Sequence, residues 1–332
     1  MNKIFSEMFS RQPDEIIGGD YFYRVPWYEQ EWSLSILARQ YGMSEAEYLE
    51  RMEKKSRKNF RSGWDERTFH SEWKWLECLR GDDKATEIFQ KIARERIPFM
   101  DIASSEVMGL ASYILKLNPQ TPCLVTDIDS NAMKRLRSRA DESLPEYHIS
   151  IASFDNLDMP LKDHSVDCIT SVGGISDSAT GKPVNSAVMS IEHFTYINKI
   201  KLLNEVYRVL KPNGRFITVE LEMDAAIDWQ KIDSYFSGHE KLFGMYTQNV
   251  VQTKLKAFEE WQKKYAVRDE KMTAAGFEIE IERRHCAKMG ADVIAQYLSP
   301  TGDSVQLEKH DPAEDIIGLY MCSVLYILRK PL

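Results

Sequence analysis

The chain has 332 residues, with 51 acidic and 43 basic side chains, and 43% of its residues are hydrophobic. This composition is typical of a globular protein and excludes collagen, a low-complexity disordered chain and a small disulfide-stapled scaffold. The formal net charge of −8 disfavours nucleic acid as a partner, because phosphate binding needs clustered lysine and arginine, although it does not exclude a local basic patch.

The first 95 residues are predicted to form a helical cap. Ser44 and Glu47 have the spacing of a capping box, which opens a helix through Tyr48 and Met52. Further helical stretches are expected over 69–79 and 84–94. Five of the seven tryptophans also lie in the first 75 residues.

Residues 96–332 are predicted to form an α/β domain. From Ile97 onward, short apolar runs alternate with helical segments, which is typical of a parallel sheet with crossover helices. The sequence KPNG at 211–214 ends one helix and turns into the next strand. A helical insertion is expected at about 225–265, after the fifth strand, and the chain then returns to strands.

Cysteine spacing and hydropathy bear on location. The five cysteines, at 78, 123, 168, 286 and 322, include no CxxC pair, so neither a disulfide framework nor a zinc site is predicted, and no metal is expected. They are interpreted as small core residues in a reducing compartment. No stretch approaches the roughly 20 apolar residues that span a bilayer, and the first 20 residues lack an apolar leader. These features predict a cytoplasmic protein without a membrane partner.

Acidic residues follow three of the predicted strands. Asp101 ends the first strand, Asp127 the second and Asp155 the third. Ligands of open α/β sheets bind at the carboxyl ends of the strands, and a carboxylate after the second strand can accept hydrogen bonds from both hydroxyl groups of a ribose. Each aspartate could alternatively be an ordinary helix cap.

Three segments resemble motifs of the class I S-adenosylmethionine-dependent methyltransferases. They are VTDIDSNAM (125–133), DNLDMPLKDHSVDCITS (155–171) and YRVLKPNGRFITVE (207–220). The resemblance covers residues 97–223 and 266–332. It implies a Rossmann-like, seven-stranded, mostly parallel sheet whose last strand is antiparallel, with S-adenosylmethionine as cofactor.

The resemblance assigns roles to residues at the strand ends. Asp101 matches the acid near the amino group of the cofactor's methionine, and Asp127 matches the ribose-binding acid. Asp155 matches the acceptor for the adenine amino group. The other residues expected at the cofactor are Ala103, Ser105, Ile128, Asn156, Ser171 and Gly173, the last two in the 171–174 stretch that lines the methyl-transfer region.

The first motif departs from the family. Its glycine positions hold Ala103, Ser105 and Val107, of which a β-branched valine would be strained at positive φ. The loop is therefore open to a different path, with Gly109 as an alternative source of freedom. This departure leaves a second interpretation open, in which the protein has this fold and binds a cofactor or a partner without catalysis.

Catalysis requires few side chains if the reaction is methyl transfer. An in-line displacement at a sulfonium carbon gains much of its rate from alignment and exclusion of water. Some acceptors also need deprotonation, for which His193 and Glu220 are the candidates. His193 has the alternative of a core or surface position.

Aromatic residues of the cap are candidates for binding the acceptor. Aromatic faces can cover an apolar or cationic acceptor, or they can pack the cap onto the core. The predicted substrate-binding residues are Tyr21, Tyr23, Trp27 and Trp32, with Tyr28 beside them.

The expected function is methyl transfer from S-adenosylmethionine to a small molecule. A nicotinamide-dependent oxidoreductase is disfavoured because no G-x-G-x-x-G follows the first strand. An RNA or protein methyltransferase stays open as a further alternative. The sequence distinguishes neither O-, N- and C-methylation nor the oligomeric state, and it is compatible with a homodimer.

Overall fold

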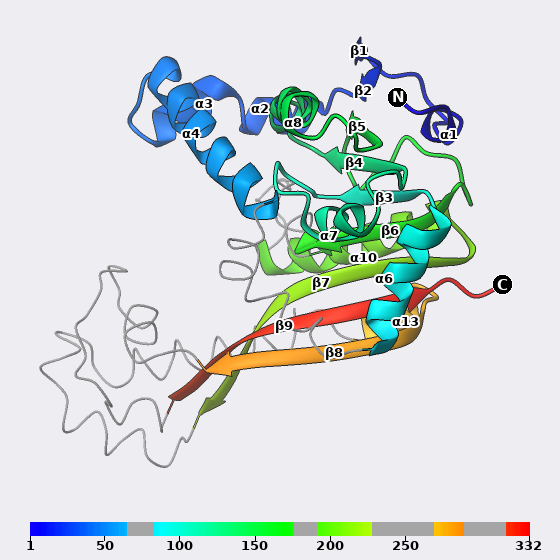
Figure 1. Ribbon diagram of the computed structural model, residues 1–332. Coiled ribbons are helices and arrows are strands. Elements are labelled where there is room, and N and C mark those ends of the chain that lie inside the picture. The colour runs from blue at the N-terminus through cyan, green and yellow to red at the C-terminus, as the bar shows by residue number, and fades with distance from the viewer. Residues whose placement is uncertain (65–82, 176–190, 228–268, 289–316) are drawn as a thin grey trace, which may run out of the picture. The chain divides into compact units, whose positions relative to one another are not determined.

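The computed structural model describes residues 1–64, 83–175, 191–227, 269–288 and 317–332 (Figure 1). The chain forms two compact units. The first comprises Met1–Glu220, Val267–Arg283 and Leu325–Leu332, and the second comprises Leu221–Ala266 and Arg284–Val324. All the sequence-predicted site residues fall in the first unit.

The described helices are distributed along the whole chain. They are α1 (Lys3–Ser6), α2 (Pro26–Glu31), α3 (Leu34–Gln40), α4 (Glu45–Trp64), α6 (Asp83–Glu95), α7 (Gly109–Leu117), α8 (Ser130–Ser143), α10 (Ile191–Val209) and α13 (Asp269–Ala274).

The described strands form one sheet in the order β1-β2-β5-β4-β3-β6-β7-β9-β8. They are β1 (Glu15–Ile17), β2 (Asp20–Phe22), β3 (Phe99–Ile102), β4 (Cys123–Asp127), β5 (Ile149–Ser153), β6 (Val166–Val172), β7 (Leu210–Ile227), β8 (Glu278–Lys288) and β9 (Ile317–Arg329).

The centre of the sheet is parallel and its last strand is antiparallel. The pairs β5–β4, β4–β3, β3–β6 and β6–β7 are all parallel. The N–H of Asn213, early in β7, donates to the carbonyl of Lys330 just after β9 (2.8 Å), and the N–H of Lys330 donates to the carbonyl of Gly214 (2.9 Å). The start of β7 therefore lies beside the end of β9, so the two strands run in opposite directions. This confirms the predicted Rossmann-like class, with β9 inserted between β7 and β8.

The N-terminal segment contains two strands that the helical expectation missed. The short hairpin of β1 and β2 joins the sheet edge, where Tyr21 pairs with Ala152 of β5 in parallel. Among the described residues the sheet therefore has nine strands rather than the seven expected. The sequence signal was weak because each strand spans three residues. The domain boundary near residue 95 stays a prediction.

Several predicted helices are confirmed in the cap. At the start of α4 the Ser44 N–H donates to Oε2 of Glu47 (2.8 Å), and the Glu47 N–H donates to Oγ of Ser44 (3.3 Å). This reciprocal pair is the predicted capping box. α6 occupies the third predicted stretch. The second, over 69–79, lies outside the described residues, as does most of the insertion expected at about 225–265. The part of that insertion that is described, up to Ile227, belongs to β7 rather than to a helix.

Helices cover both faces of the central sheet, with α7 in front of it and α10 behind it in Figure 1. The apolar side of α7 is fully buried through Leu110, Ile114 and Leu115. Burial of each such side chain contributes roughly 1.5–3 kcal/mol to stability. Gly109 opens this helix because an added Cβ would lie 2.7 Å from Cγ2 of Val172 in β6. Close helix–strand contact thus explains this glycine, whose φ is not positive.

The cysteine interpretation is partly wrong. Cys123 and Cys168 are free and buried, as expected of core residues. Cys286 of β8 and Cys322 of β9 instead form a disulfide. Their separation of 36 residues hid the pairing, which arises because the two strands are neighbours in the sheet. Cys78 lies outside the described residues.

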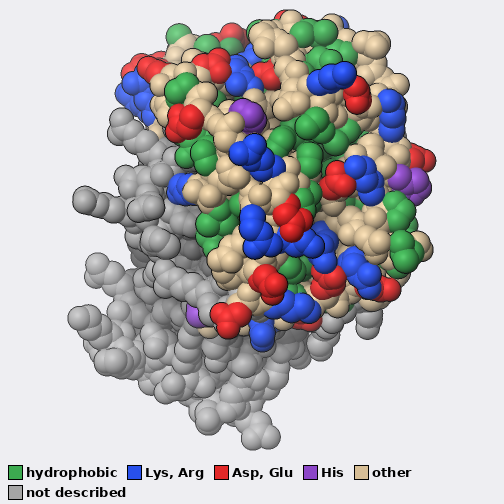
Figure 2. Space-filling view, turned by 45° about the vertical axis from the view of Figure 1, so that its right-hand side comes forward, with side chains coloured by type: hydrophobic (Ala, Val, Ile, Leu, Met, Phe, Trp, Pro, Cys, Tyr) green, Lys and Arg blue, Asp and Glu red, His purple; other side chains and the backbone are tan. Residues whose placement is uncertain are grey.

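The described residues contain neither a membrane-spanning helix nor a candidate metal cluster. None of the helices described is long and apolar enough to cross a membrane. Among the described residues, no group of three or more His, Cys, Asp and Glu side chains could hold a metal ion. On the coloured part of the surface in Figure 2, Lys and Arg side chains are interspersed with Asp and Glu side chains.

Candidate functional site

The carboxyl ends of β3, β4, β5 and β6 meet at one edge of the sheet because these neighbouring strands are parallel. The three aspartates predicted at strand ends, Asp101, Asp127 and Asp155, lie at this edge. The site therefore consists of the loop after β3, the ends of β4 and β6, and the first residues after β5.

The loop after β3 follows a left-handed path without glycines. Ala103 and Ser105 have φ values of 53° and 50°, at two of the three positions where the family pattern has glycine. At the third position Val107 stays out of this region, and Met108 takes positive φ (57°) instead, just before α7. Left-handed backbone costs an ordinary residue roughly 1–2 kcal/mol. The loop thus has positive φ at two of the three glycine positions of the family pattern, and this conformation strains its backbone.

Asp127 fixes this loop through its carboxylate. The N–H of Ser105 donates to Oδ2 (2.8 Å), and the N–H of Asp129 donates to Oδ1 (3.0 Å). Each carboxylate oxygen can accept more than one hydrogen bond, so both retain acceptor capacity. Burial raises the pKa of Asp127 to about 6, and the backbone N–H groups offset part of that effect.

Asp101 acts from beneath the loop. Its side chain is 1% exposed, and it accepts hydrogen bonds from the hydroxyl groups of Ser104 (2.5 Å) and Thr170. Burial raises its pKa to about 6. These contacts hold the loop to β6 from within the molecule. The predicted contact of Asp101 with the cofactor amino group stays a prediction.

Asp155 has an aromatic partner from the cap. The indole Nε1 of Trp27 donates to its Oδ2 (3.1 Å), while the N–H of Leu157 donates to its Oδ1 (2.8 Å). The adjacent Asn156 is buried. Trp27 was predicted to bind the acceptor, yet it lies beside a residue expected at the adenine. The cap thus reaches the segment that follows β5.

Two other predicted acceptor residues make contacts typical of packing. The ring of Phe9 lies against those of Tyr21 and Tyr23, with centroids 5.0 and 5.7 Å apart. The hydroxyl of Tyr23 donates to the carbonyl of Arg11 (2.8 Å). These contacts fasten the N-terminus to the sheet edge, which corresponds to the packing alternative. Trp32 stacks on Tyr28 at a separate pocket, described below.

The end of β6 approaches the β3 loop closely. The hydroxyl of Ser171 donates to the carbonyl of Ile102 (3.3 Å), and Gly173 has a φ of 68°. A Cβ on Gly174 would lie 1.9 Å from Oγ of Ser171 and 3.5 Å from Cβ of Ala103. Glycine at 173 and 174 is therefore required by backbone conformation and by space, respectively.

The two candidate bases are Glu220, in the central part of β7, and His193, in α10. Glu220 is fully buried, and its Oε1 accepts hydrogen bonds from the N–H of Ile175 (3.2 Å) and the hydroxyl of Thr218 (2.6 Å). It therefore lies next to the end of β6, as topology predicted, and it fixes the chain there. His193 lies in the first turn of α10, but its side chain lies outside the described residues.

Sequence reasoning missed several residues that shape the site. Ser104 and Thr170 hold Asp101, and neither has a sequence signal beyond its place at a strand end. Glu106, in the loop, is buried and accepts a hydrogen bond from Nε of Arg135 (2.6 Å). Arg135 belongs to the basic motif at 134–139, which suggests a solvated helix face.

The order and direction of the strands identify the fold. Five parallel strands have the order β5-β4-β3-β6-β7, an antiparallel final strand follows, and acids end β4 and follow β5. The chain has a class I methyltransferase fold.

Comparisons with known proteins add limited likenesses. No protein-family model matches the chain, and no curated protein matches it significantly. An arsenic(III) S-adenosylmethionine methyltransferase from Chlamydomonas reinhardtii is 14% identical, with a TM-score of 0.38 over 71% of this chain and 64% of that one. An S-adenosylmethionine-dependent methyltransferase from Methanosarcina mazei is 14% identical, with a TM-score of 0.37 over 71% and 92%. A [4+2]-cyclase, SpnF, is 14% identical, with a TM-score of 0.38 over 75% and 83%.

Proposed function

We propose that the protein binds S-adenosylmethionine across the carboxyl ends of β3, β4 and β5 and transfers its methyl group to a small-molecule acceptor. The carboxylate of Asp127 carries this proposal. It is held by two backbone N–H groups at 2.8 and 3.0 Å and keeps acceptor capacity on both oxygens, which suits a vicinal diol.

The surrounding residues fit such a ligand. The positive φ values of Ala103 and Ser105 give the loop a glycine-like path, so its backbone can approach a ligand closely. Asp155 offers a second carboxylate after the next strand, suited to an adenine amino group. Gly173 and Gly174 keep bulk away from the edge beyond Ala103.

The chain's own contribution to methyl transfer is mainly to position the cofactor and the acceptor. When bound, the cofactor supplies a methyl group on a positively charged sulfur. The chain contributes acceptors that fix the ribose and adenine and a loop braced by Asp101, so that the methyl group is held in line for attack. Glu220 braces the chain after β6 through the N–H of Ile175. Proton transfer by Glu220 or His193 stays a prediction.

Cofactor binding is tested by calorimetric titration with S-adenosylhomocysteine. We expect Asp127→Asn to weaken binding at least tenfold, because the amide loses acceptor capacity toward the ribose. Asp141→Asn is the matched control: it removes the same charge from an exposed side chain of α8, and we expect affinity within about twofold of wild type. Unchanged affinity of Asp127→Asn, or no binding by the wild-type protein at high micromolar concentration, would contradict the proposal.

A second candidate function is cofactor binding without catalysis. The loop after β3 favours it, because Ala103, Ser105 and Val107 hold the family's glycine positions and Val107 does not take positive φ. Radiolabelled S-adenosylmethionine incubated with the small-molecule fraction of a cell extract separates the two. An enzyme forms S-adenosylhomocysteine above a boiled control, whereas cofactor binding without such turnover supports the second function.

A further inference from the structure

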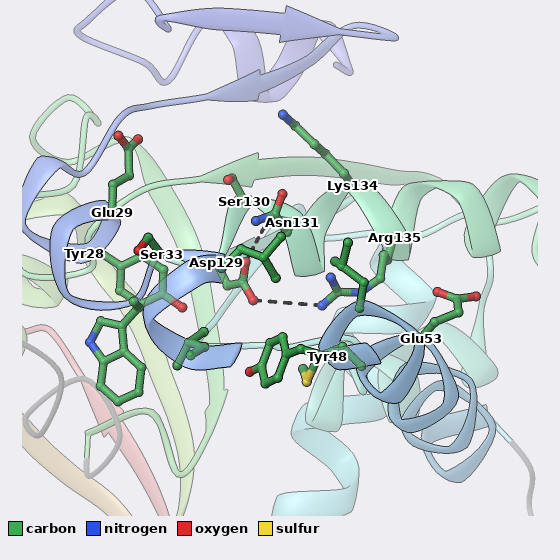
Figure 3. A pocket seen from close by; sticks show the side chains of 15 residues that line it. Tyr28, Glu29, Ser33, Tyr48, Glu53, Asp129, Ser130, Asn131, Lys134 and Arg135 are labelled. Atoms are coloured by element: carbon green, nitrogen blue, oxygen red, sulfur yellow. Dashed lines mark hydrogen bonds and ion pairs between the residues drawn. The ribbon is translucent and has the colours of Figure 1, made fainter. Parts of the chain in front are cut away.

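A pocket of about 600 Å³ lies between the cap and the beginning of α8 (Figure 3). Its walls come from α2, α3 and α4 on one side and α8 on the other. The volume is within the range of small-molecule sites. It is lined by Tyr28, Glu29, Trp32, Ser33, Leu34, Leu37, Tyr48, Leu49, Met52, Glu53, Asp129, Ser130, Asn131, Lys134 and Arg135. None of the residues assigned to the cofactor or to the end of β6 is among them.

The apolar part of the pocket is an aromatic and aliphatic wall. The rings of Tyr28 and Trp32 stack with centroids 6.3 Å apart and planes at 18°. Trp32 is 44% exposed and Leu49 is 50% exposed, so apolar surface at this pocket remains in contact with solvent. A ligand that covers it gains hydrophobic free energy, and a cation placed over the aromatic faces is attracted further.

The two basic side chains of the pocket are already engaged. Nε of Arg135 donates to Oε1 of Glu106 (2.6 Å), and Nζ of Lys134 donates to Oε2 of Glu15 (3.1 Å). In Figure 3 the Lys134 side chain points away from the centre of the pocket. An anionic ligand would have to compete with both ion pairs.

Asp129 offers the opposite charge. Its Oδ1 accepts hydrogen bonds from the N–H groups of Asn131 and Ala132, which satisfies the start of α8. Its Oδ2 forms an ion pair with Nη2 of Arg135 at 3.9 Å, a separation too long for a hydrogen bond, and so keeps acceptor capacity. Glu29 and Glu53 also line the pocket, but Glu29 pairs with Arg24 and Glu53 with Arg57 and Arg139, which leaves Asp129 as the carboxylate with an open acceptor position. Burial, followed by the charges of Asp129 and Asp127, raises the pKa of the Tyr28 hydroxyl, which therefore stays neutral.

We propose that this pocket binds a protonated amine that carries an aromatic or branched apolar body. The ammonium group contacts Oδ2 of Asp129, and the apolar body lies against the ring pair of Tyr28 and Trp32. The pocket adjoins the proposed cofactor site, since the N–H of Asp129 donates to Asp127, but it shares no lining residue with that site, and the proposal does not depend on methyl transfer.

Calorimetric titration with three indoles of similar shape tests the charge preference. The probes are tryptamine, the neutral 2-(indol-3-yl)ethanol and indole-3-acetate. We expect tryptamine to bind with a submillimolar Kd, at least tenfold more tightly than the alcohol, and the acid to bind weakest. Equal affinities, a preference for the acid, or no saturable binding of tryptamine would overturn the proposal.

Two variants locate the binding site. Asp129→Asn removes the charge but keeps a good helix cap, so we expect a five- to tenfold loss for tryptamine and less than twofold for the alcohol. Trp32→Ala, at an exposed position, should weaken both probes. An Asp129→Asn variant that binds tryptamine like wild type would overturn the assignment. Displacement of tryptamine by saturating S-adenosylhomocysteine would place it in the cofactor site and also overturn the proposal.

Discussion

Alanine and serine occupy left-handed backbone in the loop after β3, at φ of 53° and 50°. The fold holds them there because Asp127 accepts the N–H of Ser105 and Asp101 accepts the hydroxyl of Ser104. The loop therefore depends on two buried or half-buried carboxylates rather than on glycine freedom. This bracing explains how the loop takes positive φ without the glycines of the family pattern.

A glycine at position 103 should relieve the backbone strain of the loop after β3. We expect Ala103→Gly to raise the free energy of unfolding by about 0.5–1 kcal/mol, after allowance for the greater entropy of the unfolded glycine chain. Ala132→Gly is the matched control, since Ala132 lies in α8, and it should lower that free energy by about 1 kcal/mol. Urea denaturation of both variants measures the difference. Equal destabilisation by the two changes would show that Ala103 carries no backbone strain.

The raised pKa of Asp127 has consequences for both stability and binding. Because its pKa in the folded chain, about 6, exceeds the ordinary value, the folded state binds the proton more tightly. The resulting stability is fully present below about pH 4 and is lost as the pH rises through about 6. A ribose diol, in contrast, requires the ionised carboxylate as acceptor.

Cofactor affinity should therefore fall with acidification. With a pKa of about 6, the ionised fraction of Asp127 drops from about 90% at pH 7 to about 10% at pH 5. We expect the Kd for S-adenosylhomocysteine to rise about tenfold over this range. Calorimetric titrations at several pH values measure it, with Asp127→Asn as the control that should respond much less. An affinity that is flat from pH 5 to 7 would contradict the role given to Asp127.

At the scale of elements, α8 joins the N-terminal segment to the sheet. Arg135, Arg137 and Arg139 pair with Glu106 of the loop, Asp20 of β2 and Glu53 of α4, at 2.6, 2.7 and 2.8 Å. A basic run such as KRLRSR at 134–139 by itself suggests a solvated helix face, but these three arginines are mostly buried and paired. Acidic partners far away in the sequence determine their burial.

The pair of Arg137 and Asp20 should be the strongest of these links. Asp20 is 1% exposed and also accepts the N–H of Ile151 (3.0 Å). We expect Asp20→Asn to lower the free energy of unfolding by about 2–4 kcal/mol, since an amide group would face the guanidinium. Asp141→Asn removes the exposed partner of the same arginine and should cost less than about 0.5 kcal/mol. Chemical denaturation compares them, and equal effects would refute the role of buried pairing.

At the scale of the whole molecule, the disulfide between Cys286 and Cys322 ties β8 to β9. The two cysteines are 36 residues apart, and the segment between them belongs wholly to the second unit. Such a link restricts the unfolded chain, and chain-entropy reasoning assigns it about 3–4 kcal/mol. It also opposes the sequence-based expectation of a chain with only reduced thiols.

The state of these thiols can be measured directly. Peptide mapping without reductant should recover Cys286 and Cys322 as one linked species, and Cys286→Ser should lower the melting temperature under oxidising conditions. The same substitution should change little when wild type and variant are compared in reductant. Recovery of both cysteines as free thiols from protein purified without reductant would contradict the link.

Much of the fold and part of the site were predictable because they depend on local patterns. Alternating apolar runs and helical segments predicted the parallel sheet, and the capping box predicted the start of α4. Aspartates at strand ends were expected to share one edge, and the parallel strands bring them there; that this edge binds a ligand stays a prediction. The three-residue strands β1 and β2 were not predictable, because a hairpin this short lacks periodicity and is held by Asp20 and Arg137.

The sequence by itself determined the fold class, since this follows from the order of elements along the chain. The site edge and the roles of Asp127 and Asp155 as its acids stay predictions. Only the tertiary structure decided what each side chain contacts. In the folded chain Asp101 is buried against Thr170, Trp27 donates to Asp155, Glu106 pairs with Arg135, and a pocket forms at Asp129. The physical reason is that hydrogen bonds and ion pairs between residues more than 20 positions apart depend on how elements pack, which no local pattern encodes.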